Sequence, residues 1–238
     1  MKKAIIITLL LTGCGAAEAP VEPTPVMQIQ PVEVDVAPVV DHRAVILSDL
    51  GLDPSEKYDA EDLAYLAREF VYKTNTWPTE DSTWIEVNDD FFPVYEAWKL
   101  GEAKFKCGGS GYTLAWMLEE IGVPARGVQL AAQTFLDGEA NLDTHVTTEV
   151  FLNGKWVVQD ATFNVSFECD GKPASILDLV DCDEVVSISG EDQSKHTLEA
   201  YPVPFLDFLA AYSINNPYAS KLKYESVPEY PFQNWEVQ

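Results

Sequence analysis

Two stretches of this chain repeat apolar residues every three or four positions, which is the spacing of an amphipathic helix. The first runs from about Asp59 to Lys73, with Asp59 as its N-cap. The second begins at Cys107 and ends at Gly122. A shorter helix is expected from Pro93 to Trp98, ending at Gly101. The buried stripes of the two long helices are expected to be Leu63, Leu66, Phe70 and Val71, and Leu114, Met117, Leu118 and Ile121.

After Gly122 the pattern changes to alternating apolar and polar residues, which predicts strands. One strand is expected from Ala125 to Ala131, and a polar loop from Thr134 to Asn141. Strands from Thr144 to Phe151 and from Trp156 to Asp160 are joined by Asn153-Gly154, a strong signal for a two-residue hairpin turn. Helices first and strands afterwards predict an α+β fold.

Weaker patterns cover the rest of the chain, and no internal repeat is visible. The segment from Thr76 to Asp90 is expected to be a loop or a short strand, and a further helix is expected from about Val203 to Tyr212. The C-terminal residues are rich in proline and aromatics and are expected to pack as a coil over the domain, around Pro217, Tyr218, Tyr230 and Trp235.

Residues 1–13 are typical of a secretory signal peptide, because Lys2 and Lys3 precede an apolar run too short to cross a bilayer. The run ends in Leu11-Thr12-Gly13-Cys14, which resembles the lipobox of bacterial lipoproteins. That resemblance implies cleavage before Cys14, a lipid on its sulfur, and a location in the cell envelope. Gly15 after the cysteine implies the outer membrane, facing the periplasm. The alternative is an ordinary secreted protein with an incidental cysteine.

Residues 14–40 are low in complexity and are expected to form an extended tether. Repeated prolines favour polyproline II structure over a packed fold. The prolines of this tether are Pro20, Pro23, Pro25, Pro31 and Pro38. Residues 41–238 are then expected to form one domain, long enough to bury a core.

The chain carries a formal net charge of −24, which excludes nucleic acid as a partner because phosphate binding needs clustered Lys and Arg. We expect this charge to form a solvated acidic surface that keeps the protein soluble. The chain is expected to be a monomer. The alternative is that the charge attracts cationic, lysine-rich substrates.

Candidate chemistry begins at Cys107, the first residue of the second long helix. A helix N-terminus carries unpaired N–H groups and about half a positive charge, which favour the thiolate over the thiol. Because the thiolate is the reactive form, Cys107 is a candidate nucleophile.

The predicted hairpin supplies a partner for this thiol. With Asn153-Gly154 as the turn, His145 lies opposite Thr162, and Asp160 is diagonal to His145 on the same face. Diagonal neighbours are about 7–8 Å apart, close enough for an imidazole and a carboxylate to meet. Such a carboxylate fixes the tautomer of the ring and stabilises the imidazolium.

The other two histidines, His42 and His196, are expected to be solvated. No Cys-x-x-Cys or His-x-x-x-His spacing is present, so neither a metal site nor a cofactor is expected. Calcium on the acidic loops near Asp137 and Asp170 stays an alternative to a solvated surface.

Two cysteines remain if Cys14 carries a lipid and Cys107 is the nucleophile. Cys169 and Cys182 flank a turn-rich segment, and outside the cytoplasm paired cysteines oxidise. A disulfide between them is therefore expected, with a contribution of about 3 kcal/mol at most. Two unrelated buried thiols are the alternative.

The segment from Cys107 to Leu118, which continues to Gly122-Val123-Pro124-Ala125-Arg126, resembles the core motif of the transglutaminase-like superfamily. His145–Phe151 and Trp156–Thr162 resemble its second and third motifs, and together these cover about residues 95 to 165. The resemblance implies a papain/transglutaminase-like α+β core in which a nucleophile helix packs on an antiparallel β-sheet. It also implies a catalytic triad of Cys107, His145 and Asp160.

The chain departs from the family pattern at two positions. Ala161 stands where a proline often follows the Asp, and Val146 where an aromatic often follows the His. The family's oxyanion donor usually lies upstream, which makes Trp98 a candidate, with a core position as its alternative. The backbone N–H of Cys107 is a second candidate donor.

The resemblance implies an acyl-transfer enzyme in which the thiolate attacks a peptide or glutamine carboxamide carbonyl and a thioester forms. Resolution by water gives a cysteine protease or a deamidase, and resolution by an amine gives a cross-linking transglutaminase. We favour hydrolysis. The competing class is an envelope module that binds peptides without turnover.

Overall fold

The fold was analysed in a computed structural model, which describes residues 40–77, 91–139, 144–200, 204–209 and 211–213. The predicted signal peptide, nearly all of the predicted tether and the predicted C-terminal coil lie outside these residues. Most of the segment from Thr76 to Asp90 lies outside them as well.

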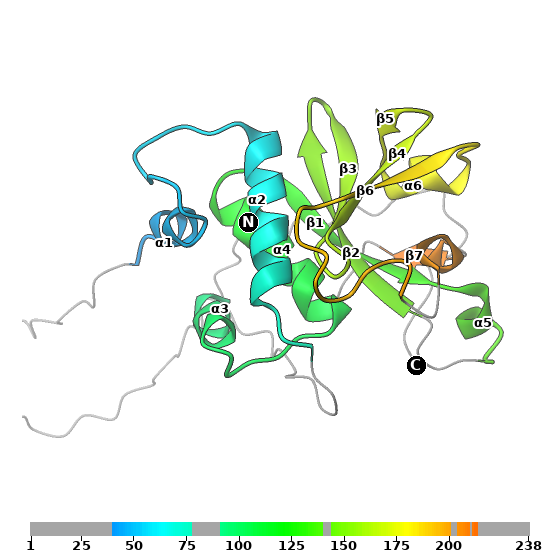
Figure 1. Ribbon diagram of the computed structural model, residues 1–238, viewed down its shortest axis with the longest axis horizontal. Helices are drawn as coiled ribbons and strands as arrows, with labels where there is room; N and C mark the ends of the chain where they lie inside the picture. The colour runs from blue at the N-terminus through cyan, green and yellow to red at the C-terminus, as the bar shows by residue number, and fades with distance from the viewer. Residues whose placement is uncertain (1–39, 78–90, 140–143, 201–203, 210, 214–238) are drawn as a thin grey trace, which may run out of the picture. The chain divides into compact units, whose positions relative to one another are not determined.

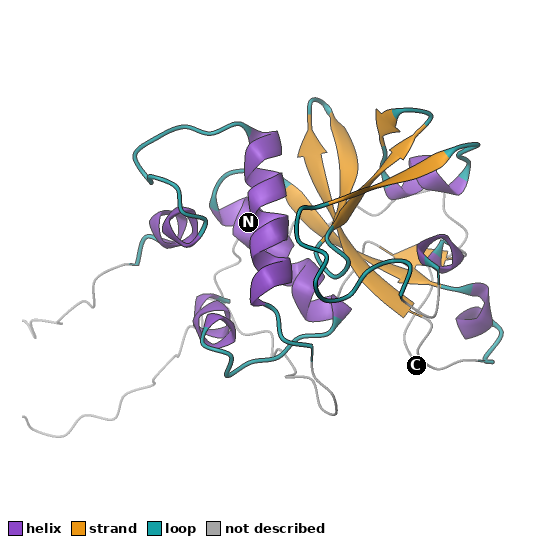
Figure 2. Cartoon of the chain, viewed as in Figure 1, coloured by secondary structure: helices purple, strands orange, loops and turns teal. Residues whose placement is uncertain are grey.

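The helices come first along the chain and the strands follow (Figures 1 and 2). The principal helices are α1 (His42–Asp49), α2 (Ala60–Thr74), α3 (Phe92–Lys99) and α4 (Cys107–Glu120). Shorter helical segments are α5 (Gln133–Leu136), α6 (Ile176–Val180) and the 3₁₀ turn η1 (Phe205–Phe208).

The three predicted helices are confirmed as α2, α3 and α4. The side chain of Asp59 accepts a hydrogen bond from the N–H of Glu61 and so caps α2, as expected. Pro93 stands in the first turn of α3, where its missing N–H costs nothing. Gly122 has a φ of +88°, the left-handed conformation that ends α4.

The strands form one antiparallel sheet in the order β5-β4-β3-β2-β1-β7, with β6 paired to β4. Its strands are β1 (Ala125–Ala131), β2 (Thr144–Leu152), β3 (Lys155–Asp160), β4 (Val165–Cys169), β5 (Lys172–Pro173), β6 (Val185–Ser189) and β7 (Ala211–Ser213). The predicted α+β class is therefore confirmed.

The hairpin of β2 and β3 has the predicted register, with Leu152 opposite Lys155 and Phe151 opposite Trp156. Asn153 and Gly154 have φ values of 50° and 86°, as a two-residue turn of this kind requires. The ladder between the strands stops at the pair Thr148 and Gln159, so the strands separate before they reach His145.

Each face of the sheet covers a separate apolar core. On one face the long helices α2 and α4 pack against the sheet, and that core includes Leu63, Val71, Leu114, Met117 and Val150. On the other face α6 and η1 contribute to a core that includes Val128, Leu130, Phe167, Ile176 and Phe208. Alternate residues of β1 enter the two cores, as the pleat of a strand requires.

Gly111 allows α4 to lie directly against β2. A Cβ atom at this position would come within 3.0 Å of Cγ1 of Val146 and 3.3 Å of the carbonyl oxygen of Thr147. The carbonyl of Gly111 accepts a hydrogen bond of 2.8 Å from the hydroxyl of Thr148 on the same strand. The glycine therefore sets how close the N-terminal half of α4 comes to the strand that carries His145.

Two local predictions are wrong. The polar segment from Thr134 to Asn141 begins inside a short helix, α5, because the backbone N–H of Asp137 closes a helical turn on the carbonyl of Gln133. The helix expected from Val203 to Tyr212 is replaced by η1 and β7, with residues 203 and 210 outside the described ranges. Pairing of Tyr212 with Leu130 on β1 overrides the helical spacing.

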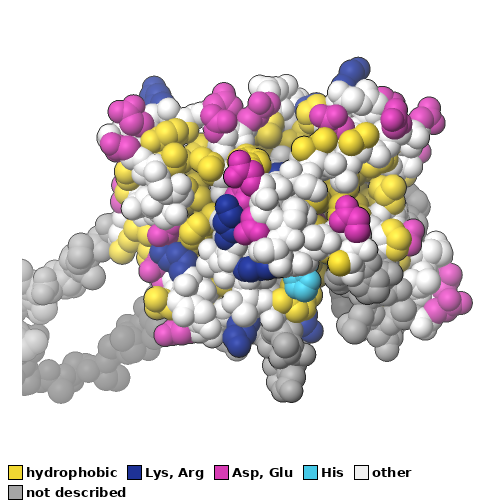
Figure 3. Space-filling view, in the orientation of Figure 1, with side chains coloured by type: hydrophobic (Ala, Val, Ile, Leu, Met, Phe, Trp, Pro, Cys, Tyr) yellow, Lys and Arg dark blue, Asp and Glu magenta, His cyan; other side chains and the backbone are white. Residues whose placement is uncertain are grey.

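Acidic side chains are scattered over the face drawn in Figure 3 and do not form a single patch there. Within the described part of the chain, no helix combines the length and the hydropathy that a membrane crossing needs.

Candidate active site

Cys107 is the first residue of α4, and the residue as a whole is partly accessible to solvent. No acidic residue stands in the first turn of this helix, and the preceding residue, Lys106, makes no side-chain cap. The N–H groups of this turn and the positive end of the helix dipole therefore act on the sulfur without competition from a carboxylate.

His145 and Asp160 form a short, fully buried pair. Nε2 of His145 donates a hydrogen bond of 2.6 Å to Oδ2 of Asp160, and neither side chain is exposed to solvent. The other carboxylate oxygen accepts the backbone N–H groups of Thr162 and Phe163, each at 2.9 Å. Both oxygens are thus occupied, which fixes the carboxylate and, through it, the imidazole.

The second ring nitrogen of His145, Nδ1, is buried and has no hydrogen-bond partner among the described residues. The aromatic rings of Phe163, Phe205 and Phe208 surround the imidazole, with ring centroids at 5.0, 5.7 and 5.4 Å. These rings exclude water from the His145–Asp160 pair, while Nδ1 is left for the thiol and for a substrate.

Cys107 meets His145 where the hairpin strands have separated. The thiol interacts with the imidazole and with the backbone N–H of Val146, the residue after His145. The pairing of β2 with β3 ends at Thr148 and Gln159, so the edge of β2 at His145 and Val146 is open to the Cys107 sulfur. The structure therefore brings together all three residues that the sequence proposed as a triad.

The two pKa shifts favour an ion pair of thiolate and imidazolium. Burial on its own would raise the pKa of the Cys107 thiol, but its interactions with His145 and with the N–H of Val146 outweigh burial and lower it. Burial would likewise lower the pKa of His145, but the charge and hydrogen bond of Asp160, with a smaller contribution from Cys107, raise it to about 10. The proton thus moves from sulfur towards nitrogen.

Trp98 does not fit its predicted role as an oxyanion donor. Its side chain is buried in the helical core, 1 % exposed, and stacks on Phe105 at a centroid distance of 6.1 Å. The indole N–H donates to Oδ1 of Asn75 at 3.3 Å, so it is not presented to a substrate. The backbone N–H of Cys107, at the start of α4, stays the candidate donor.

Asn75 is a supporting residue that the sequence gave no reason to select. It is buried at the end of α2, and its amide donates to the carbonyl of Phe105 at 3.0 Å and to the hydroxyl of Ser110 at 2.9 Å. These two residues lie on either side of Cys107 in the chain. Asn75 therefore anchors the chain before and after the nucleophile.

The other two histidines are not simply solvated, as the sequence had suggested. His42 stacks on Phe92 at 4.3 Å and pairs with Glu120 at 3.2 Å. His196 is half-buried and packs edge-on against Trp77 at 4.5 Å. Both contacts join each histidine to an aromatic residue far away in the sequence, so the polar residues beside the histidines did not predict them.

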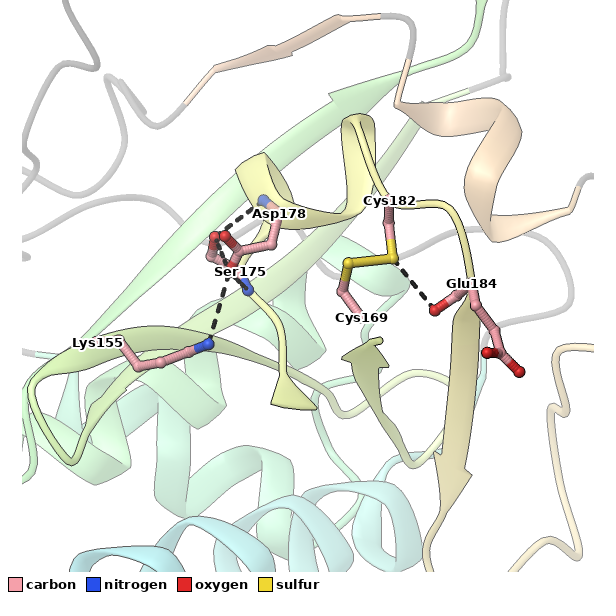
Figure 4. Close-up of a disulfide and its surroundings, with 6 residues drawn as sticks. All are labelled: Lys155, Cys169, Ser175, Asp178, Cys182 and Glu184. Carbon is pink, nitrogen blue, oxygen red and sulfur yellow. Dashed lines mark hydrogen bonds and ion pairs between the residues drawn. A yellow bond between two sulfur atoms is a disulfide. The ribbon is translucent and has the colours of Figure 1, made fainter. Parts of the chain in front are cut away.

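Cys169 and Cys182 form a disulfide with a Cα–Cα distance of 5.7 Å, which joins the end of β4 to the segment after α6 (Figure 4). With Asp170 these two sulfurs make up the group of potential metal ligands found among the described residues. Both sulfurs are used by the disulfide, so this group has no thiolate to offer a metal. Cys14 lies outside the described residues.

No protein-family model matches the chain, and no curated protein matches it. Among solved structures, a proposed cysteine protease from Cytophaga hutchinsonii is similar at a TM-score of 0.37 and 15% identity, over 50% of this chain and 36% of that one. A TGase structure is similar at a TM-score of 0.35 and 21% identity, over 54% of this chain and 35% of that one. The match thus spans about a third of the length of each protein.

Proposed function

We propose that this chain is a transglutaminase-like cysteine enzyme that cleaves peptide or carboxamide bonds through a thioester on Cys107. The observation that carries the proposal is the 2.6 Å bond between His145 and Asp160 beside a thiol at a helix N-terminus. A structural histidine needs one hydrogen-bond partner. This one has a dedicated carboxylate on Nε2 and an unused Nδ1 next to a cysteine whose pKa is lowered.

In this mechanism the sulfur of Cys107 attacks the carbonyl carbon, and the carbonyl electrons move to the oxygen. The backbone N–H of Cys107 is placed to donate to that oxyanion. His145 then gives the proton on Nδ1 to the leaving amine, the C–N bond breaks, and a thioester is left on the sulfur.

Water resolves the thioester in the second half of the reaction. Neutral His145 takes a proton from the water as the oxygen attacks, the C–S bond breaks, and the thiolate and the imidazolium are restored. Asp160 keeps the ring oriented in both halves and stabilises its charged form. A primary amine in place of water gives transamidation, which uses the same residues.

The test is to incubate bacterial envelope proteins with the full chain and with a Cys107→Ala variant, and to compare the peptides by mass spectrometry. The proposal expects new peptide termini with the wild type alone. Deamidated or cross-linked glutamines in their place would support the transglutaminase alternative. If iodoacetamide rapidly alkylates Cys107 but the wild type and Cys107→Ala give equal peptide patterns, the proposed hydrolase activity is overturned.

We also propose that the enzyme acts at the cell envelope, with a lipid on Cys14. The lipobox-like Leu11-Thr12-Gly13-Cys14 supports this location. A Cys14→Ser variant is then expected to leave the membrane fraction, and unchanged fractionation would contradict lipidation.

A further inference from the structure

A cavity of about 250 Å³ lies between the C-terminal end of α2 and the turn that follows Asp160. Its lining includes Tyr72, Asn75, Trp77, Thr162, Lys195 and His196. The mechanism described above uses none of these side chains to move protons or electrons, so the cavity needs an explanation of its own.

The walls of the cavity are held in place before any ligand arrives. Nζ of Lys195 donates to the backbone carbonyls of Tyr72, Lys73 and Asn75 at 3.1, 2.5 and 2.7 Å, at the carbonyl end of α2. The backbone N–H of Lys195 donates to the hydroxyl of Tyr72 at 2.6 Å. The next residue, His196, packs on Trp77. A cavity with fixed walls binds with a smaller loss of conformational entropy.

Two of these walls also support the candidate active site. Asn75 donates to the carbonyl of Phe105 and to the hydroxyl of Ser110, around Cys107. The backbone N–H of Thr162 donates to Asp160. The cavity therefore borders both the segment that carries Cys107 and the turn that carries Asp160.

The chemistry of the lining selects the kind of side chain. Its accessible surface is mainly apolar, and none of the described residues that line it is an Asp or a Glu. Burial, and then the charge of Lys195, lower the pKa of His196, so its ring is neutral and offers an apolar face. The charge of Lys195 repels a cation, whereas the Trp77 and His196 rings offer aromatic contacts.

We propose that this cavity is a substrate subsite that binds an aromatic side chain of the peptide next to the scissile carbonyl. The proposal rests on the proposed function for its place in catalysis. The selectivity that it predicts is a property of binding, however, and can be measured without turnover.

Titration of the Cys107→Ala chain with N-acetyl-phenylalaninamide and N-acetyl-lysinamide, followed by the indole NMR signals, tests the selectivity. We expect the aromatic amide to bind about tenfold more tightly, a difference of about 1.4 kcal/mol. Thr76 lines the cavity and is exposed, so Thr76→Glu adds a charge there with little effect on folding. This change is expected to reverse the order of the two affinities.

Ser194→Glu is the matched control, because Ser194 is exposed next to Lys195 but does not line the cavity. It adds the same charge and is expected to leave the aromatic preference unchanged. Equal affinities for the two amides in the Cys107→Ala chain, or a preference that follows Ser194→Glu as strongly as Thr76→Glu, would overturn the subsite. Cleavage that depends on Cys107 but shows no aromatic preference would overturn it while the proposed function stands.

A separate observation concerns Arg68, a buried cation on α2 that is 2 % exposed. Its Nε donates to Oδ1 of Asn164 at 3.1 Å, and its Nη1 donates to Oε1 of Gln159 at 2.6 Å. Gln159 precedes Asp160 and Asn164 follows it by four residues, so one guanidinium joins both ends of the turn that carries Asp160. Asn164 is held in the left-handed conformation, with a φ of 53°.

We infer that Arg68 is a positioning residue for Asp160. Its planar fork reaches two acceptors at once, which a lysine ammonium at the same position does not reproduce. Loss of the two guanidinium hydrogen bonds leaves the turn without this support. A displaced Asp160 carboxylate then orients the imidazole of His145 less well, and the imidazole in turn stabilises the Cys107 thiolate less.

The rate at which iodoacetamide alkylates Cys107, measured from pH 5 to 10, tests this role. In Arg68→Gln and Arg68→Lys we expect the acid limb to move to higher pH and the rate at pH 6 to fall about tenfold. Gln159→Met removes one acceptor at a half-buried site and is expected to give a smaller shift in the same direction. It keeps the test valid if the Arg68 variants do not fold.

Glu69 accepts a hydrogen bond of 2.7 Å from the amide of Asn164 and pairs with Lys73 at 2.9 Å. Lys73→Gln is the matched control, since the Lys73 side chain is 51% exposed and makes no described bond to the turn itself. Its profile should follow that of the wild type. A wild-type alkylation profile in folded Arg68→Gln, in folded Arg68→Lys or in Gln159→Met would overturn the role. A wild-type thiol that is slow to react at every pH would contradict the proposed function instead.

Discussion

Nε2 of His145 and Oδ2 of Asp160 are 2.6 Å apart, and neither side chain is reached by solvent. In this buried setting a charge on the imidazole depends on the carboxylate, because solvent does not reach the ring to stabilise it. The pair is therefore the electrostatic centre of the site, and the state of the Cys107 thiol follows from it.

The first prediction removes the charge of Asp160 while keeping its shape. In Asp160→Asn the imidazolium loses its largest support, so the pKa of His145 falls. The charge of Asp160 by itself raises the pKa of Cys107, but the interactions with His145 that lower it are larger, so we expect their weakening to raise the pKa of the thiol overall. We expect turnover to drop by about 100- to 10,000-fold. The pH at which iodoacetamide labels Cys107 at half its maximal rate should also move upwards. An unchanged labelling profile in the folded variant would mean that Asp160 does not control the thiol.

The second prediction concerns stability against pH. The raised pKa of His145 adds stability that is complete below its ordinary value of 6.5 and is lost as the pH rises through about 10. The lowered pKa of Cys107 has the opposite sign, since its stability appears as the pH rises towards the ordinary value of 9.0.

Between these two values the shifts oppose each other, so this pair should add little slope to the unfolding free energy of the wild type. In Cys107→Ala the histidine effect stands alone, and stability should fall from about pH 6.5 upwards. Urea unfolding at pH 6, 7, 8 and 9 measures the difference between the two chains. Parallel curves would contradict the coupling of Cys107 with His145.

The third prediction concerns the disulfide between Cys169 and Cys182, which are 13 positions apart in the chain. Replacement of both by alanine should lower the free energy of unfolding by about 3 kcal/mol, as expected for a loop of this size. Alkylation of Cys107 at pH 7 should not change, because the bridge joins β4 to the segment after α6 and takes no part in the hydrogen bonds that hold His145 and Asp160. Urea unfolding with and without reductant measures the loss, and an equal effect of reductant on the alanine variant would contradict it.

The fourth prediction concerns Arg126 and Glu149, a buried ion pair across β1 and β2 at 2.7 Å. The other oxygen of Glu149 accepts the backbone N–H of Ile176 at 2.8 Å, at the start of α6. Glu149→Gln leaves the guanidinium without its counter-charge and should cost about 3–5 kcal/mol in unfolding free energy.

The double variant Arg126→Met with Glu149→Gln removes the uncompensated charge and should recover part of that loss. A double variant less stable than Glu149→Gln alone would contradict the assignment of the cost to the unpaired guanidinium.

The sequence predicted those parts of the fold that are set by local rules. Capping by Asp59, the stop at Gly122 and the turn at Asn153-Gly154 fixed α2, α4 and the hairpin register. Continued past the observed ladder, that register predicts Asp160 diagonal to His145. The strands separate after Thr148 and Gln159, but the two side chains still meet, so the sequence indicated the central contact of the site.

What the sequence missed depends on contacts between distant segments. Arg68 and Asn164 are 96 positions apart, and no periodic pattern relates them. The indole N–H of Trp98, a candidate oxyanion donor by sequence, donates to the side chain of Asn75, which lies 23 positions earlier in the chain. Pairing of β7 with β1 likewise replaced a helix that local spacing favoured.

The most direct test of the central claim is to trap the acyl group on Cys107. The full chain is mixed with a pool of peptides, quenched in acid within milliseconds, and mapped by mass spectrometry. We predict an adduct on Cys107 that hydroxylamine removes, as expected for a thioester, and that Cys107→Ala lacks together with all turnover. Turnover that persists in Cys107→Ala, or an adduct that maps to another residue, would contradict the account.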